Sequence, residues 1–185
     1  MRTMVDRLMA TDQRLLDRLG GVESGVLDHA LPRLGVAANY GRLWMGVAAL
    51  LVLTGRPDAR RAAARGLASQ ALASGVANVV AKGAVRRVRP TTARLPAVRL
   101  LRRAPVTTSF PSGHSASAAA FATGAALEMP ALAVPLGCLA VAVAVSRVVT
   151  GAHYPSDVVT GVALGAGAAS LTLRVAPRGG RPRRG

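Results

Sequence analysis

The sequence predicts an all-α fold: a transmembrane helical bundle of about five to six helices with an N-terminal amphipathic segment. Of its 185 residues, 51% belong to hydrophobic types. Long stretches such as 131–145 and 158–173 contain no charged residue, and arginines bound the apolar segments. This pattern is typical of membrane spans with charges at the interface. The length fits one domain.

Charge alone would suggest a nucleic-acid binder, because Lys and Arg number 24 against 8 acidic residues, for a net charge of +16. The uncharged stretches argue against a soluble protein of that class. We therefore expect a lipid bilayer as partner and no nucleic acid. Cys138 stands alone in an apolar run, so it forms no internal disulfide and is interpreted as a small hydrophobic residue.

Residues 1–40 mix charged residues with Leu and Met. Leu8, Leu15, Leu16 and Leu19 recur at helical spacing against Arg7, Arg14 and Arg18. This predicts one or two amphipathic helices at the membrane surface or on the bundle. A short soluble cap is the alternative for this segment.

Five candidate spans follow, at 41–55, 60–86, 112–128, 131–149 and 156–174. Tyr40 and Trp44 suit an interfacial aromatic belt. Gly161 and Gly165 form a small-xxx-small pair, which allows helices to approach closely in lipid. We thus divide the chain into an amphipathic segment 1–40, a membrane-embedded bundle 41–175 and a disordered basic tail 176–185.

Three groups of polar residues interrupt this apolar pattern. The first runs from Lys82 to Arg89-Pro90, the second is Pro111-Ser112-Gly113-His114, and the third is Ser146-Arg147 with His153 and Asp157 downstream. Each lies at a predicted helix end. An up-and-down bundle places all of these ends on one membrane face, whereas Glu128 falls on the opposite face.

The first group and Arg147 supply cations suited to a phosphate. A phosphate monoester needs several fixed positive charges to leave water, and arginine offers a bidentate fork. Lys82, Arg89 and Arg147 could make these contacts. Alternatively, Lys82 and its neighbouring arginines are a basic flank beside the membrane.

The second group begins a helix. Ser112 is a natural N-cap, which is also its purely structural interpretation. The same geometry would aim the backbone N–H groups of Gly113 and His114 at a bound phosphate. His114 could then protonate a leaving alkoxide.

The third group contains a histidine and a carboxylate. Asp157 could accept a hydrogen bond from His153, fix its tautomer and make the imidazole a usable nucleophile. The alternative is a capping Asp beside a chance histidine. The candidate site contains one carboxylate and no metal-ligand cluster. We therefore expect no metal and no cofactor, and transfer through a phosphohistidine.

These motifs, K-x6-R-P at 82–90, P-S-G-H at 111–114 and S-R-x5-H-x3-D at 146–157, resemble those of the type 2 phosphatidic acid phosphatase family. The resemblance spans about residues 60–175 and implies a helical membrane bundle that dephosphorylates a lipid phosphate or diphosphate without a metal. By that resemblance the phosphate ligands are Lys82, Arg89, Ser112, Gly113 and Arg147. His153 is then the nucleophile, Asp157 its partner and His114 the general acid.

Phosphatidic acid, phosphatidylglycerol phosphate and polyprenyl phosphates or diphosphates all fit such a site, and the oligomeric state is open. The positive-inside rule puts the face carrying Arg56, Arg60 and Arg61 in the cytoplasm, so we expect a multi-pass protein of the cell membrane with its site on the extracytoplasmic side. Four arginines share the active face and could recruit anionic headgroups: Arg94, Arg99, Arg102 and Arg103.

Two other functions compete with this one. A vanadium-dependent haloperoxidase uses a similar anion-binding constellation, although such proteins are usually soluble and larger. A non-catalytic basic membrane protein that binds anionic lipid would be indifferent to replacement of His114 or His153.

Overall fold

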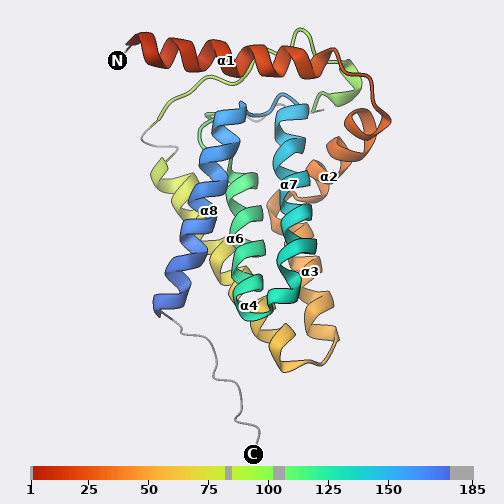
Figure 1. Cartoon of the computed structure of the whole chain (residues 1–185), viewed down its shortest axis with the longest axis vertical. Helices are drawn as coiled ribbons and strands as arrows, with labels where there is room; N and C mark the ends of the chain where they lie inside the picture. Colours follow the sequence, from red (N-terminus) through yellow and green to blue (C-terminus); the bar gives the residue numbers. More distant parts are fainter. Residues whose placement is uncertain (1, 82–84, 102–106, 176–185) are drawn as a thin grey trace, which may run out of the picture.

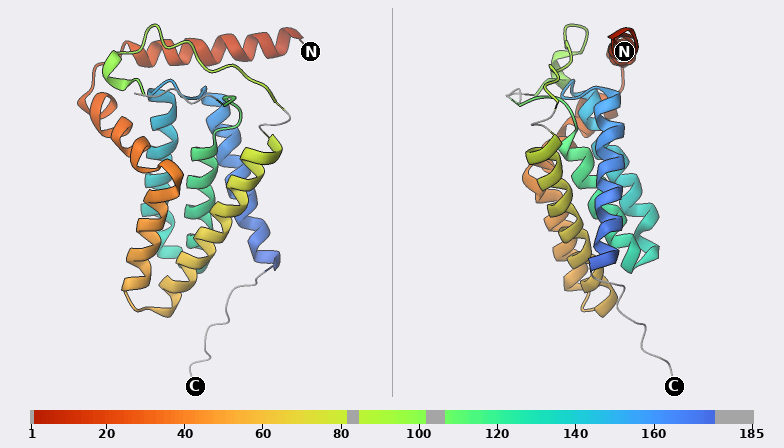
Figure 2. Two further views of the ribbon diagram at one scale, coloured as in Figure 1. Left: turned by 180° about the vertical axis from the view of Figure 1, so that it is seen from behind. Right: turned by 90° about the vertical axis from the view of Figure 1, so that its left-hand side faces the viewer.

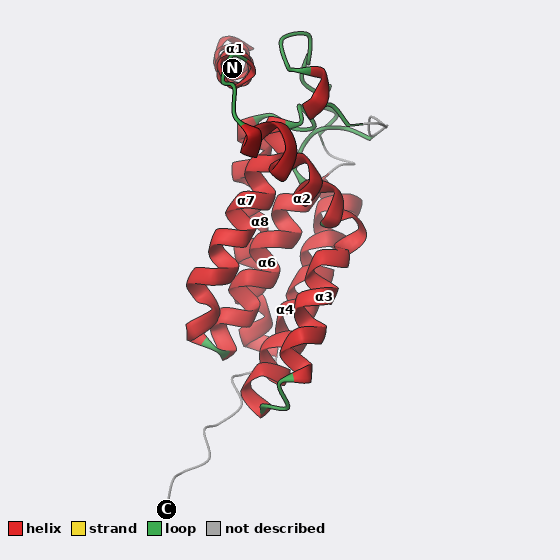
Figure 3. Ribbon diagram, turned by 90° about the vertical axis from the view of Figure 1, so that its right-hand side faces the viewer, coloured by secondary structure: helices red, strands yellow, loops and turns green. Residues whose placement is uncertain are grey.

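Helices that run along the long axis of the molecule form a bundle, and one further helix lies across its end (Figure 1). The computed structural model describes residues 2–81, 85–101 and 107–175. Lys82, Arg102, Arg103 and the tail 176–185 lie outside the described residues. Within the described ranges the regular elements are helices, with no strand (Figure 3). The prediction of an all-α fold is thus confirmed.

Each predicted apolar span overlaps a bundle helix. These helices are α3 (Arg42–Leu53), α4 (Pro57–Gly75), α6 (Gly113–Glu128), α7 (Ala133–Val149) and α8 (Pro155–Val175). The span predicted at 60–86 differs most, since α4 ends at Gly75 and a π-helical turn, Val76–Ala81, continues it. Two short helical elements, the π-helical turn Val26–Ala30 and α2 (Leu31–Ala37), precede a tight turn at Asn39–Gly41 that leads into α3.

Helix α6 occupies the centre and packs against α4, α7 and α8 (Figures 1 and 2). Small residues allow this contact. A Cβ on Gly161 would lie 2.5 Å from the Ser112 carbonyl oxygen, and one on Gly165 would overlap the Ala116 carbonyl. The predicted small-xxx-small pair therefore brings the backbone of α8 directly onto that of α6, where helices in lipid gain most of their packing energy.

Trp44 does not belong to an interfacial belt, contrary to the sequence-based expectation. Its side chain is 1% exposed and its ring lies 5.2 Å from that of Phe121, inside the bundle. Tyr40, in contrast, is 92% exposed. Trp44 is buried because α3 packs on α4, which turns the indole ring toward α6.

Helix α1 (Arg2–Gly20) lies across the end of the bundle where α7 ends and α8 begins (Figures 1 and 2). Leu16 is fully buried against Leu95, Val148 and Val158, so one side of α1 is docked on the bundle. Leu8 remains exposed. The helix predicted within 1–40 thus carries apolar residues on its docked side and also on its open side.

Arg99 does not serve as a free surface cation, as its grouping with the headgroup-recruiting arginines had suggested. It is fully buried, and its Nε donates to Asp28 Oδ1 at 2.7 Å. Its other nitrogens donate to the backbone carbonyls of Leu19 and Val22. Arg99 therefore clamps the turn after α1. Arg94 is exposed and lies 3.7 Å from Asp17.

The far end of the bundle holds an ion pair between helices. Glu128, at the end of α6, accepts a hydrogen bond from Arg65 Nε of α4 at 2.6 Å. Both side chains are largely buried. Glu128 is therefore far from the start of α6, as expected, but it joins two helices instead of standing alone at an interface.

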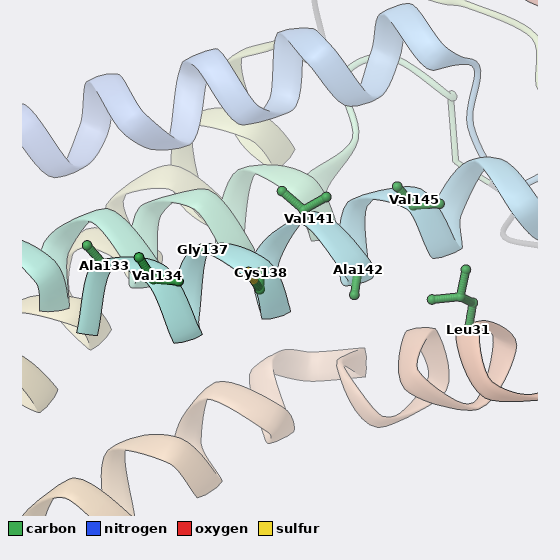
Figure 4. Close-up of a pocket in the computed structure, with 8 residues that line it drawn as sticks. All are labelled: Leu31, Ala133, Val134, Gly137, Cys138, Val141, Ala142 and Val145. Atoms are coloured by element: carbon green, nitrogen blue, oxygen red, sulfur yellow. The ribbon is translucent and has the colours of Figure 1, made fainter. Parts of the chain in front are cut away.

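Two helical segments of the described chain are long and apolar enough to cross a membrane: Pro130–Val149 and Pro155–Leu173. A third span is possible if the bent pair Val26–Ala37 and Asn39–Leu53 counts as one. An apolar groove of about 580 Å³ runs along the outer face of α7 beside Leu31 (Figure 4). Its exposed Val134, Cys138 and Val141 match a face in contact with hydrocarbon.

We expect Gly165→Ala to destabilise the bundle, because its methyl group would meet backbone atoms of α6 that cannot move independently. Overpacking of this kind costs about 1–3 kcal/mol, which lowers Tm by roughly 2 to 8 °C in a chain of this size. Gly167→Ala is the matched control, since a Cβ there meets nothing within 4 Å. Thermal unfolding in detergent measures both. A Gly165→Ala variant as stable as Gly167→Ala would contradict the packing argument.

Candidate active site

A cavity of about 420 Å³ opens at the end of the bundle near α1. Five of the sequence-predicted site residues lie on its wall, although they come from distant parts of the chain: Arg89, Gly113, His114, Arg147 and His153. Ser112 and Asp157 are fully buried beside it. The remaining predicted ligand, Lys82, lies outside the described residues.

The start of α6 faces this cavity. Ser112 is the N-cap, and its Oγ accepts a hydrogen bond from the Ser115 N–H at 3.4 Å. The Ser112 N–H donates to the carbonyl of Asp157 at 3.1 Å, which ties the start of α6 to that of α8. Gly113 is the first helical residue and lines the cavity, so the positive end of the helix dipole lies next to it.

Two arginines place positive charge on the wall. The guanidinium of Arg89 is oriented by the carbonyls of Thr107 at 2.9 Å and Ala152 at 2.5 Å. Arg147 is 3% exposed, and its Nε has no hydrogen-bond partner among the described residues. Neither guanidinium forms an ion pair with a described carboxylate. A buried cation without a counter-ion is costly, so this arrangement favours a bound anion.

His153 is held as a specific tautomer. Its ring is 4% exposed, and Nδ1 lies 2.6 Å from the carbonyl oxygen of Ser109. Because a carbonyl only accepts, Nδ1 carries the proton and Nε2 keeps the lone pair when the ring is neutral. Burial, and then the nearby charges of Arg89 and Arg147, lower the pKa of His153 well below its ordinary value. This shift favours the neutral imidazole, whose Nε2 lone pair is available as a nucleophile.

The hydrogen bond expected between His153 and Asp157 is absent. Asp157 Oδ2 lies 3.9 Å from His153 Nδ1 and accepts instead from the backbone N–H of Tyr154 at 3.0 Å. Its Oδ1 accepts from Arg87 Nη1 at 2.6 Å. Asp157 thus caps the start of α8 and acts on His153 through charge, while the backbone of Ser109 fixes the tautomer.

His114 is oriented by a residue that sequence reasoning missed. Its Nε2 lies 2.8 Å from Oδ1 of Asn39. Asn39 stands at the turn before α3, where Tyr40 and Gly41 take positive φ values of 55° and 73°. This tight turn brings Asn39 back over the start of α6. The only sequence signal was the Asn-Tyr-Gly turn, since Gly and Asn favour such backbone.

Comparison with known proteins places this geometry in a family. The model of the PAP2 superfamily matches residues 63–181. A lipid A 1-phosphatase from Rhizobium johnstonii is 46% identical over 72 residues, which cover 39% of this chain and 30% of that protein. The chain therefore spans less than a third of the length of this curated relative.

Two further proteins resemble the chain over most of its length. A decaprenylphosphoryl-5-phosphoribose phosphatase from Mycolicibacterium smegmatis is 34% identical over 160 residues, covering 84% of this chain and 80% of that protein. The crystal structure of a transmembrane PAP2-type phosphatidylglycerolphosphate phosphatase from Bacillus subtilis covers 91% of this chain and 86% of its own at a TM-score of 0.69. At 20% identity, that likeness concerns the fold. Because the family model matches well over half of its residues, the chain belongs to the PAP2 superfamily.

Proposed function

We propose that this protein is a metal-independent phosphatase that hydrolyses a phosphate ester on a membrane lipid through a phosphohistidine. The observation that carries the proposal is the cavity itself. It combines a neutral histidine of defined tautomer, His153, with two guanidinium groups that lack a carboxylate partner among the described residues, Arg89 and Arg147. An anion that supplies the missing negative charge and presents an electrophilic phosphorus completes this arrangement.

The first half of the reaction transfers the phosphoryl group to the enzyme. Arg89, Arg147 and the start of α6 at Gly113 hold the phosphate oxygens, with Lys82 as the further ligand suggested by the motif. His153 Nε2 attacks phosphorus, and the bond from phosphorus to the lipid oxygen breaks. His114 donates its proton to that oxygen, so the lipid leaves as an alcohol.

The second half releases phosphate. Water attacks the phosphohistidine, the phosphorus–nitrogen bond breaks, and His114 accepts the proton from water. During both steps, positive charge on His153 is steadied by the Asp157 carboxylate at 3.9 Å. Inorganic phosphate then leaves, and the proton that His114 took from water restores the acid for the next cycle.

The wall beyond the cations favours a substrate with a polar head group. Gln70, Ser74 and Asn78 follow one another at four-residue spacing along α4 and the π-helical turn, and Ser117 of α6 faces them. These uncharged side chains offer hydrogen bonds next to the phosphate. We therefore propose a lipid whose phosphate is borne by a hydroxyl-bearing group, such as the phosphoribose or glycerol phosphate in the relatives' names.

We further propose that all five bundle helices cross the cell membrane and that the site faces the extracytoplasmic side. Arg56, Arg60 and Arg61 gather at the opposite end of α4, which the positive-inside rule assigns to the cytoplasm. Helix α1 then lies in the outer interface, with exposed Met4 and Leu8 directed toward lipid.

Replacing either cavity histidine should abolish or impair phosphate release in detergent with EDTA present. We expect His153→Asn to lose at least about 10³-fold in kcat, because the variant lacks the imidazole Nε2 that attacks phosphorus in the proposed reaction. In His114→Asn, kcat should fall about 10²–10⁴-fold on phosphatidylglycerol phosphate. It should fall less on p-nitrophenyl phosphate, because that leaving group needs no proton. His29→Asn, at an exposed histidine, is the control. Equal losses on both substrates would refute the acid role of His114.

The lowered pKa of His153 predicts that its ring is protonated at a lower pH than the ring of an ordinary histidine. Histidine-labelled protein in detergent, followed by NMR, measures the titration, and loss of the signal in His153→Asn assigns it. We expect a midpoint below 6.5. A midpoint at or above that value would contradict the role of burial and of the two arginines.

The polar wall predicts a selective effect of Asn78→Leu. We expect kcat/KM to fall about tenfold or more for phosphatidylglycerol phosphate, whose hydroxyl loses a hydrogen-bond partner, and to stay nearly constant for dodecyl phosphate. Leu72→Ala, at an exposed position of α4 away from the cavity, is the control. A parallel loss on both substrates would remove the support for a hydroxyl-bearing head group.

A further inference from the structure

We propose that Asp12 and Arg87 are positioning residues. Through them, helix α1 holds the proposed nucleophile His153 and the nearby Asp157 carboxylate in place. The inference rests on the proposed function and extends it to two residues that the motifs do not specify: Asp12 precedes them all, and Arg87 occupies an unspecified position within 82–90. Neither touches the cavity. Both act through groups that do, and they link the N-terminal helix to the nucleophile.

The link begins on the docked side of α1. Asp12 is 3% exposed although it carries a charge. Its Oδ2 accepts from Arg87 Nη2 at 2.7 Å and from Ser156 Oγ at 2.5 Å, and its Oδ1 accepts from the Ser156 backbone N–H at 3.1 Å. Asp12 therefore supplies an acceptor to the first turn of α8 from a different helix, 144 residues away in the chain.

Arg87 continues the link to the site. Its Nη1 donates to Asp157 Oδ1 at 2.6 Å, and its guanidinium lies over the ring of Tyr154 at 4.1 Å from the centroid. The same residue acts through its backbone, since its carbonyl accepts from the Ser109 N–H at 2.9 Å. The guanidinium is thus shared by two buried carboxylates, one on α1 and one on α8.

Both groups that approach Nδ1 of His153 therefore depend on residue 87. The Ser109 carbonyl accepts the hydrogen bond from Nδ1–H, and the Ser109 N–H is held by the backbone carbonyl of Arg87. Asp157, at 3.9 Å from the same nitrogen, is held by its side chain. This pairing keeps Asp157 near enough to steady the phosphohistidine. It also restrains the carboxylate from rotating to accept the hydrogen bond of Nδ1–H, which would favour protonation of Nε2 and leave a non-nucleophilic imidazolium.

The charge environment of His153 makes this control effective. Arg89 from the preceding loop, Arg147 from α7 and His114 from α6 all disfavour the protonated ring. Asp157 from α8 is the only carboxylate among the described residues within ion-pair distance of it. Removing Arg87 would leave that buried carboxylate without its ion-pair partner, 3.9 Å from the imidazole, and so would favour the protonated ring.

The test compares charge-removing variants with matched neighbours in the full-length protein. Asp12→Asn and Arg87→Gln should each lower kcat at least tenfold on phosphatidylglycerol phosphate, with KM changed less than threefold, because the cations on the cavity wall are untouched. Asp17→Asn on the same helix and Arg86→Gln, at the exposed neighbouring residue, should stay within twofold of wild type. The double variant Asp12→Asn/Arg87→Gln should be no slower than Arg87→Gln alone, since the pair acts as a unit.

A pH profile separates positioning from general destabilisation. In Arg87→Gln the acid limb of kcat should move upward by about 1 pH unit, as the freed Asp157 carboxylate favours the imidazolium. The ionisation of the substrate contributes equally to both profiles. An unshifted acid limb, or a rise in KM that accounts for the lost activity, would overturn the proposal. Arg87→Lys keeps the positive charge but lacks the guanidinium that bonds both carboxylates. The acid limb of this variant should therefore return toward its wild-type position, while kcat stays reduced.

A third measurement does not depend on catalysis. If Asp12 docks α1, trypsin should cleave at Arg14 and Arg18 at least several-fold faster in Asp12→Asn than in Asp17→Asn. Equal cleavage rates would overturn the docking role. The two proposals can fail separately. If the wild-type protein releases no phosphate from any lipid tested, the proposed function fails. If trypsin still cleaves α1 faster in Asp12→Asn, the structural link stands.

Discussion

The close approach of α6 and α8 is the constraint on which the rest of the site depends. Glycines at 161 and 165 allow the two backbones to touch, and the contact reaches the end of the bundle, where the Ser112 N–H donates to the Asp157 carbonyl at 3.1 Å. The start of α6, where we propose that phosphate binds, and the loop before α8 that carries the proposed nucleophile His153 are thereby held together. Because close packing of small residues is the main source of cohesion between helices in lipid, stability and site geometry have the same origin.

The distribution of buried charge explains why the cavity remains positive. Each buried carboxylate of the described chain is paired with an arginine outside the cavity: Asp12 and Asp157 with Arg87, and Glu128 with Arg65. Arg89 and Arg147 are left without carboxylate partners in the described part of the chain. Buried pairs contribute little net stability, but here they restrict where negative charge can lie. In the proposed reaction, no carboxylate of the described residues is ion-paired with these two guanidinium groups in competition with the phosphate.

Local sequence patterns were sufficient for some features and insufficient for others. Apolar runs located the bundle helices because hydrocarbon requires continuous apolar segments, and the Pro-Ser-Gly-His start of α6 was visible from capping preferences. The inward orientation of Trp44 could not be predicted from the sequence, since an aromatic residue near the end of a span suits both an interfacial belt and a packed core. The limits of the span predicted at 60–86 were also wrong, since α4 begins at Pro57 and residues 85–86, after its π-helical continuation Val76–Ala81, are not helical.

The sequence by itself determined the helical class, the membrane-type apolarity and the set of side chains available for phosphate chemistry, because these follow from residue type and spacing. Only the tertiary structure decided which atoms meet. His153 Nδ1–H donates a hydrogen bond to the backbone carbonyl of Ser109, a group that every residue carries and no motif records. Asn39 reaches His114 from a position 75 residues away in the chain, and Asp12 reaches Arg87 from an equal separation; such contacts depend on how helices pack and turn.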